Sequence, residues 1–162
     1  MIFLTVGSMF PFDRLIQAVD EMVGDGRITD KVSAQIGDGK YEPKNFPFKR
    51  FMGKPEYERE LAAASYLIAH AGAGTIAQAL ETGKPLLVLP RLSANKEHVN
   101  DHQIATARKF AELGHVLVAN HASELPRQLF RLKSFIPKHR EVDSEQMARR
   151  VALVLVDVKY GC

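Results

Sequence analysis

The first candidate for chemistry in this chain is a glycine-rich segment, His70-Ala-Gly-Ala-Gly-Thr75. A short apolar run, residues 66–69, precedes it, and apolar residues at helical spacing follow it. This order predicts a strand, a tight turn and a helix, with Thr75 at the N-cap position. A helix that opens at glycines presents free N–H groups at the positive end of its dipole. The segment therefore predicts an anion site, and a phosphorylated ligand is the first hypothesis.

Two other phosphate-binding motifs compete for the same glycines. Residues 72–77 satisfy the dinucleotide fingerprint G-x-G-x-x-G/A, but they lie in mid-chain, whereas a nicotinamide domain normally carries it after its first strand. The next predicted strand, residues 86–89, is followed by Arg91 where a ribose-binding acid would be expected. An arginine there suits a 2′-phosphate, so an NADP-binding module stays as an alternative. A P-loop is excluded, because Thr75 and Ile76 stand where that motif requires Lys and Ser or Thr.

A second polar segment, residues 97–103, lies near the predicted start of a helix. Within it, His98 and His102 are four positions apart and could bind one metal ion, although no third ligand is near them in the sequence. Capping of the helix by Asn100 or Asp101 is another interpretation. A cap needs only one such side chain, whereas a bound sugar needs several convergent polar groups. We therefore predict a sugar-facing set: Asn100, Asp101, His102 and Gln103.

His70 follows a buried strand and stands beside the glycine turn, which makes it a candidate catalytic residue. The alternative for a lone histidine is a packed, structural role. No nucleophilic serine or cysteine is indicated, because Ser8 and Ser65 lack a G-x-S-x-G turn and Cys162 is the last residue. Residues 9–12 are either simple packing or a mobile lip beside the site.

A sheet is needed to bring these groups together, and the apolar pattern predicts one. Strands are predicted at residues 2–6, 31–36, 48–52, 66–69, 86–89 and 116–119, and helices at 13–23, 56–64, 76–82, 99–113, 123–132 and from 143 onward. This alternation predicts an α/β fold, a Rossmann-like parallel sheet with helices on both faces. Ligands bind such sheets beyond the carboxyl ends of the strands, where we expect one rim of residues: Gly7, Ser8, His70 and Arg91.

Size and composition fit a single domain over residues 1–162. The chain has a formal net charge of +3 and 46% hydrophobic residues, a mild basic excess that permits an anionic partner without requiring one. Its single cysteine excludes an internal disulfide framework, and no apolar run is long enough to span a bilayer. The N-terminus lacks the pattern of a signal peptide, so a reducing cytoplasm is expected. The last predicted helix, about residues 143–162, either covers the sheet or docks a partner.

Three segments together resemble the donor-binding half of GT-B glycosyltransferases, and the resemblance covers nearly the whole chain. They are His70-Ala-Gly-Ala-Gly-Thr75, Gly83-Lys-Pro-Leu-Leu-Val-Leu-Pro90 and Asn100-Asp-His-Gln-Ile-Ala105. More narrowly, the chain looks like the family 28 C-terminal domain and like the small subunit of two-subunit transferases. One such subunit serves the N-acetylglucosaminyltransferase of dolichol-linked chitobiose. The opening Phe3-Leu-Thr-Val-Gly-Ser8, with Pro11-Phe-Asp-Arg-Leu15, fits the bacterial counterpart that serves exopolysaccharide and capsule synthesis.

The resemblance implies a UDP-sugar donor and a hexosyltransferase that inverts the anomeric carbon. The diphosphate would lie at the glycine turn, the uridine near residues 51–53, and Gln78 would stand where a related enzyme binds the ribose with an acid. With the rim residues, the expected donor-binding set is Gly7, Ser8, Gly72, Ala73, Gly74, Thr75, Gln78, Arg91, Asn100, Asp101, His102 and Gln103. No bound metal and no cofactor are expected.

The resemblance also implies a partner, because a GT-B enzyme needs two Rossmann-like halves. A membrane-associated, acceptor-binding subunit would hold the lipid-linked acceptor, and no nucleic acid is involved. The chain would then be cytoplasmic and peripheral to the inner membrane through that subunit. A nucleotide-sugar-binding regulatory subunit without turnover is the alternative.

Overall fold

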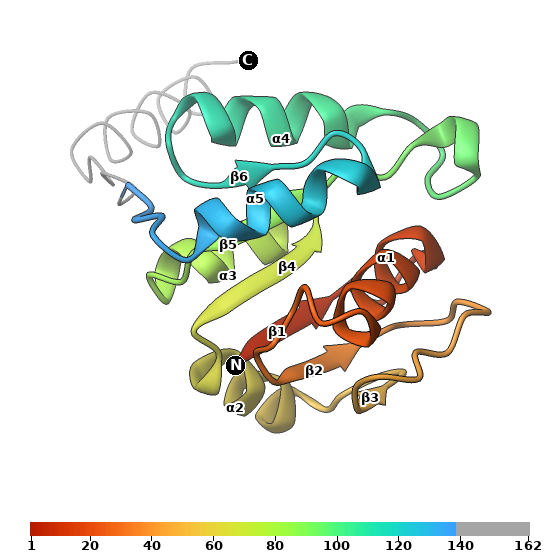
Figure 1. Ribbon diagram of the computed structural model, residues 1–162. Helices are drawn as coiled ribbons and strands as arrows, with labels where there is room; N and C mark the ends of the chain where they lie inside the picture. Colours follow the sequence, from red (N-terminus) through yellow and green to blue (C-terminus); the bar gives the residue numbers. More distant parts are fainter. Residues whose placement is uncertain (139–162) are drawn as a thin grey trace, which may run out of the picture.

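The computed structural model describes residues 1–138 and has a six-stranded parallel sheet of order β3-β2-β1-β4-β5-β6 (Figure 1). The strands are β1 (Ile2–Thr5), β2 (Val32–Gln35), β3 (Phe48–Lys49), β4 (Tyr66–His70), β5 (Leu86–Leu89) and β6 (Leu117–Val118). The α-helices are α1 (Asp13–Gly24), α2 (Lys54–Ala63), α3 (Ala73–Glu81), α4 (His102–Glu112) and α5 (Leu125–Leu132), with short 3-10 turns η1 (Ser93–Asn95) and η2 (Ala122–Glu124). The predicted α/β, Rossmann-like fold is confirmed.

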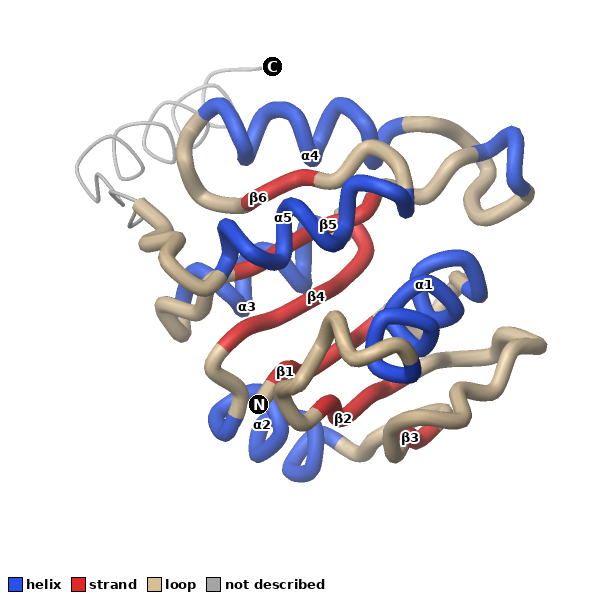
Figure 2. The backbone as a smooth tube through the Cα atoms, in the orientation of Figure 1, coloured by secondary structure: helices blue, strands red, loops and turns tan. Residues whose placement is uncertain are grey.

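The sequence of the central strands explains why helices cover both faces of the sheet. Strand β5 is a continuous apolar run, and β1 is apolar up to its last residue, Thr5, as expected for parallel strands that are buried on both sides. Successive side chains point to opposite faces, so Leu4 packs with the cluster of α1 and α5, and Phe3 packs with that of α2, α3 and α4. Figure 1 accordingly shows α1 and α5 in front of the strands and α3 behind them. Figure 2 shows how helices and strands alternate along the chain.

Helix α1 carries a buried carboxylate as well as an apolar face. Its apolar residues recur at helical spacing and are buried: Leu15, Ile16, Val19 and Met22. Asp20 is 1% exposed and lies on the same buried side. It accepts hydrogen bonds from the Tyr41 hydroxyl at 2.8 Å and from the N–H of Asn45 at 2.8 Å. This carboxylate therefore fixes the loop between β2 and β3 on α1.

Two predicted boundaries are wrong for local reasons. The strand expected over residues 48–52 ends at Lys49, because its neighbour β2 ends at Gln35 and Gly37 turns away with a φ of 64°. The helix expected from residue 99 begins at His102. Smaller differences are a β6 of two residues and a 3-10 turn before α5. The predicted helix from residue 143 lies outside the described residues.

Three strand ends meet at one edge of the sheet. In the register of the sheet, Thr5 of β1 pairs with Ala69 of β4, and Ala69 pairs with Val88 of β5. The loops that follow these strands therefore start at the same level. Among residues 1–138, no helix combines the length and apolarity that crossing a bilayer requires.

Candidate functional site

A pocket of about 510 Å³ opens at the carboxyl ends of β1, β4 and β5. The loop after β1, the turn between β4 and α3, and the segment between β5 and α4 border it. Its lining consists of Gly7, Ser8, Met9, Phe10, His70, Gly72, Gly74, Thr75, Arg91, His98, Val99, His102 and Gln103. This is the edge at which parallel sheets bind ligands. The structure thus brings together most of the residues predicted from the sequence.

The glycine turn begins α3 earlier than predicted. Gly72 is the N-cap, with φ −81° and ψ 132°, and the N–H of Ile76 donates to its carbonyl oxygen at 3.0 Å. Thr75 therefore lies in the first helical turn, and its predicted place at the N-cap is wrong. The N–H groups of residues 73–75 precede the first intrahelical donor, so they are available to an anion.

Gly74 faces open space in this turn. It lines the pocket, and a β-carbon built on it would meet no protein atom within 4 Å. Its lack of a side chain is therefore not required by packing within the protein. The glycine leaves room for a ligand to approach the N–H groups of the helix start.

His70 ends β4 and is 8% exposed. Burial, assisted by the positive charge of Arg91, lowers the pKa of His70 to about 4. The imidazole is therefore neutral near pH 7. It can donate or accept a hydrogen bond but adds no positive charge to a bound anion. Its catalytic role stays a prediction.

Arg91 lines the pocket, but most of its bonds are internal. Its Nη2 donates to the carbonyl oxygens of Val6 at 2.6 Å and Phe10 at 2.5 Å. Its backbone N–H donates to Oε1 of Gln103 at 3.1 Å. Burial lowers the pKa of Arg91 to about 10, which leaves the guanidinium charged at neutral pH. Arg91 thus supplies positive charge to the pocket while it holds the loop after β1.

The predicted sugar-facing set divides into two parts. His102 and Gln103 line the pocket, whereas Asn100 and Asp101 are outside its lining. The Asn100 side chain accepts the N–H of His102 at 3.2 Å, and the Asp101 carboxylate accepts the N–H of Ser93 at 2.7 Å. The first bond spans two residues at the start of α4, and the second spans eight residues and closes the loop before it. A contact of either residue with a sugar stays a prediction.

Two further predicted residues also lie outside the lining. Ala73 contributes only its backbone to the start of α3, and Gln78 is exposed further along this helix. The Tyr57 hydroxyl donates to Oε1 of Gln78 at 3.3 Å. The proposed contact of Gln78 with a ribose is not tested by this geometry.

Four lining residues were not in the predicted set: Met9, Phe10, His98 and Val99. The rings of Phe10 and His98 have centroids 4.7 Å apart, and those of His98 and His102 are 4.5 Å apart. The sequence predicts residues 9–12 as either packing or a lip beside the site, but no spacing rule connects them with His98. In the described part of the chain, no group of three or more metal-ligating side chains accompanies the two histidines.

Buried polar atoms without protein partners gather around this pocket. Among the described residues, four buried side-chain nitrogens or oxygens lack a hydrogen-bond partner, and three belong to lining residues. These three are Nδ1 of His70, Nε of Arg91 and Nδ1 of His98. Native proteins rarely leave such atoms unpaired away from functional sites. Three polar atoms of the lining are therefore free to bind a ligand.

Residues 1–156 match the glycosyltransferase family 28 C-terminal domain. The chain belongs to this family. The resemblance seen in its motifs is therefore confirmed. Membership of family 28 explains the glycine spacing of residues 72–77 without requiring that the chain bind a dinucleotide. The NADP-binding alternative is therefore weaker.

Curated relatives of this family 28 chain include subunits of a transferase. The UDP-N-acetylglucosamine transferase subunit ALG13 of Homo sapiens is 32% identical over 128 residues, which are 71% of this chain and 10% of that protein. The ALG13 of Candida glabrata is 38% identical over 86 residues, 51% of this chain and 41% of that protein. The chain therefore spans about a tenth of the length of the human relative.

Solved structures of glycosyltransferases and of ALG13 have a fold similar to that of this chain. The solution structure of ALG13 superposes with a TM-score of 0.58 at 21% identity and covers 93% of each chain. MurG of Acinetobacter baumannii gives a TM-score of 0.57 at 20% identity, covering 82% of this chain and 40% of that one. This family 28 domain thus has the fold of one half of a GT-B glycosyltransferase.

Proposed function

We propose that this chain is the donor-binding subunit of a two-subunit hexosyltransferase. It would move a sugar from a UDP-sugar to a polyprenyl-diphosphate-linked acceptor in exopolysaccharide or lipid-linked oligosaccharide synthesis. The observation that carries the proposal is the start of α3, which lines the pocket with Gly72, Gly74 and Thr75 and leaves open space at Gly74. The N–H groups of residues 73–75 have no acceptor within the helix. Membership of family 28 supports a glycosyl donor as the occupant.

In this proposal the diphosphate of the donor binds at the start of α3. The helix dipole and the N–H groups stabilise the charge that develops on the leaving UDP, so the step requires no metal ion. Arg91 adds a fixed positive charge from the lining. His70, being neutral, is suited to hydrogen-bond the donor. With a pKa of about 4 it would act as a proton acceptor only if the bound anionic donor raised that pKa.

The sugar is assigned to the opposite side of the pocket, against His102 and Gln103. Both belong to the first turn of α4, and the buried Gln103 keeps its amide nitrogen for a ligand while its oxygen binds Arg91. The uridine would extend toward residues 51–53, and Gln78 would meet the ribose only if the nucleotide crosses the outer face of α3. Asn100 and Asp101, whose side chains bond backbone N–H groups around the loop before α4, stay in the proposed sugar-binding set.

We further propose a membrane-associated partner that binds the lipid-linked acceptor and supplies the second half of the active site. The name of ALG13 as a transferase subunit supports this assignment. The chain would be cytoplasmic and attached to the inner membrane through the partner. Residues 143–162, outside the described part, stay our prediction for the docking segment.

Calorimetry on the full chain tests donor binding. We expect UDP and one UDP-hexose to bind and NADPH to give no heat. Tight binding of NADPH with no response to UDP would overturn the proposal in favour of the nicotinamide alternative.

A transfer assay separates an enzyme from a regulatory subunit. Membranes that contain the co-expressed partner should incorporate labelled sugar from the UDP-sugar only when this chain is present. If the partner alone transfers sugar at the same rate, and this chain merely changes the dependence on donor concentration, the regulatory alternative is correct.

A further inference from the structure

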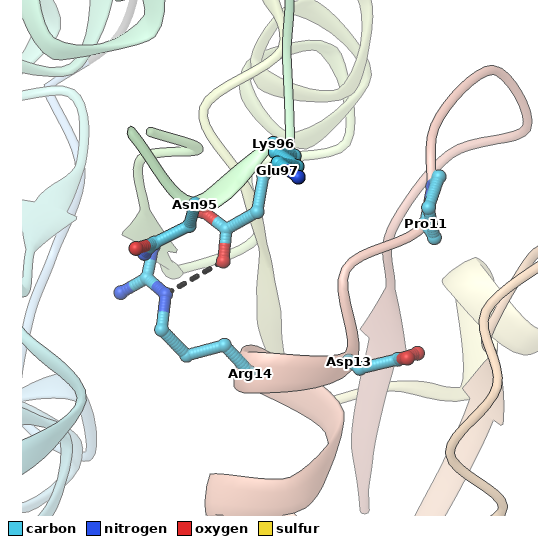
Figure 3. A pocket seen from close by; sticks show the side chains of 6 residues that line it. All are labelled: Pro11, Asp13, Arg14, Asn95, Lys96 and Glu97. Atoms are coloured by element: carbon cyan, nitrogen blue, oxygen red, sulfur yellow. Dashed lines mark hydrogen bonds and ion pairs between the residues drawn. The ribbon is translucent and has the colours of Figure 1, made fainter. Parts of the chain in front are cut away.

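An ion pair behind the pocket joins the two segments that border it. Arg14, in the first turn of α1, donates from Nε to Oε1 and from Nη2 to Oε2 of Glu97, both at 2.8 Å (Figure 3). The two residues are 83 positions apart in the sequence. The Glu97 side chain is 9% exposed, so water screens the pair weakly. Two parallel bonds also fix orientation better than a single contact.

Each residue of this ion pair also makes a hydrogen bond to the backbone of the segment after β5. Nη2 of Arg14 donates to the carbonyl oxygen of Pro90 at 2.9 Å, at the end of β5. Oε2 of Glu97 accepts the N–H of Leu92 at 2.9 Å. Arg14 of α1 therefore binds the segment after β5 at two points, Pro90 and Glu97, and the turn η1 lies between them.

The buried ring of Phe12 connects the ion pair with Arg91. The guanidinium carbons of Arg14 and Arg91 each lie 5.2 Å from the centroid of the Phe12 ring, within the range of cation–π contacts. Arg91 in turn binds the carbonyl oxygen of Phe10. We call the four residues Arg14, Phe12, Arg91 and Glu97 the clamp. It links the loop after β1 with the segment after β5.

Arg14 and Glu97 do not line the pocket, but their neighbours in the sequence do. The pair borders a separate cavity of about 340 Å³ beside Asn95 and Lys96 (Figure 3). On the pocket side stand Phe10 from one segment and His98 from the other, with ring centroids 4.7 Å apart. The clamp therefore joins the two segments from which Phe10 and His98 line the pocket.

We infer that Arg14 and Glu97 are positioning residues for donor binding, which act through Phe10 and His98 without touching the ligand. This inference rests on the proposed function, because it takes a UDP-sugar as the occupant of the pocket. Loss of the ion pair should leave the sheet and the start of α3 intact. It should let the two segments separate and so weaken the contacts that both make with the donor.

The test compares the full chain with Arg14→Met, Glu97→Gln and the double variant, using UDP and the UDP-hexose that wild type binds best. We expect each single variant to bind the UDP-hexose about tenfold more weakly. The double variant should be no weaker than the worse single variant, because the two residues act through one contact. Arg14→Lys should recover only part of the affinity, since an ammonium group cannot make both parallel bonds.

A second measurement excludes a merely structural role. Burial, with His102 and Arg91 adding their charges, lowers the pKa of His98. If the clamp positions this segment, the NMR titration of His98 in the single variants should move toward its ordinary pKa. Loss of charge alone would raise the His98 pKa in Arg14→Met and lower it in Glu97→Gln, so a rise in both variants identifies repositioning of the segment. A fall in Glu97→Gln would contradict the inference.

The exposed pair of Arg108 and Glu112 on α4 is a matched control. It has a similar N–O distance of 2.9 Å but side chains 80% and 54% exposed, and neither residue lines the pocket. Arg108→Met should leave donor affinity unchanged.

If wild type binds no UDP compound, the proposed function fails. If wild type binds and the folded Arg14 and Glu97 variants bind equally well, the inference is wrong. Should Arg14→Met not fold, Arg14→Lys and Glu97→Gln decide.

Discussion

The imidazole of His70 packs against the backbone of Gly72, two positions further along the chain. A β-carbon on Gly72 would lie 2.3 Å from Nε2 of His70, far inside any permitted contact. The loop after β1 restricts the same ring, since a β-carbon on Gly7 would lie 3.0 Å from Cε1 of His70. Glycine at both positions therefore gives the histidine its place, in addition to any room that it leaves for a ligand.

Gly72→Ala should displace the His70 ring. We expect a loss of about 1–3 kcal/mol in the free energy of unfolding, typical of overpacking in a tight site, and weaker binding of UDP. Urea denaturation and calorimetry measure the two effects. Gly74→Ala is the control for stability, because a β-carbon at this position meets no neighbouring side chain within 4 Å. A Gly72→Ala protein as stable as wild type would contradict the assigned packing.

Gly74→Val should separate binding from stability. The added side chain enters the pocket, where it meets no protein atom but occupies the space assigned to the diphosphate. We expect an unchanged melting temperature and at least about tenfold weaker UDP binding, with Gly74→Ala showing a smaller loss. Wild-type affinity in Gly74→Val would refute the role of the glycine turn.

The buried His70 should make the protein less stable as the solution becomes acidic. Its pKa is lowered to about 4 in the folded state from 6.5, the value expected when unfolded, so the unfolded chain binds the proton first. The associated stability is complete above pH 6.5 and is lost as the pH falls toward 4, with a total of roughly 3 kcal/mol.

The measurement is the free energy of unfolding at several pH values for wild type and His70→Gln. The variant should be less sensitive to pH over that window, since it lacks the titrating ring. Parallel curves for the two proteins would show that His70 is not the group responsible.

Asp20→Ala should destabilise the fold without touching the pocket. The substitution leaves the N–H groups of Lys44 and Asn45 without their acceptor, and we expect a loss of about 2–4 kcal/mol. Burial alone raises the pKa of Asp20, but hydrogen bonds from Lys44 and Tyr41 bring it below its usual value. Its contribution should therefore persist above pH 4 and disappear in stronger acid.

Denaturant titrations compare Asp20→Ala with Asp25→Ala. Asp25 forms an exposed ion pair with Arg27, with side chains 46% and 49% exposed, and its loss should destabilise the protein much less than the loss of Asp20. Equal effects of the two substitutions would mean that Asp20 does not fix the loop between β2 and β3.

The rim of the pocket was predictable because buried parallel strands have a strong signature. The apolar runs of β1, β4 and β5 need no knowledge of their partners to be recognised. Once the sheet is parallel, the residues after each run must meet at one edge. His70, Gly72 and Arg91 follow from this rule.

The contacts within the rim were less predictable. Asn100 and Asp101 have the composition of a sugar site, but their side chains bond nearby backbone N–H groups, and sequence alone does not decide between the two uses. The clamp has no local signature at all. Arg14 and Glu97 are charged residues at opposite ends of a long stretch of chain, and only the tertiary register brings them together.

The pairing of β1 with β4 has a consequence for folding. These adjacent strands are separated by about 60 residues, so the entropy of closing that loop must be overcome before either side of the pocket meets the other. One half of the sheet contains β1 to β3 and the other contains β4 to β6. The pocket and the clamp both lie across the seam between these halves. A ligand that binds this pocket and not the unfolded chain would therefore stabilise the pairing of the two halves of the sheet by mass action.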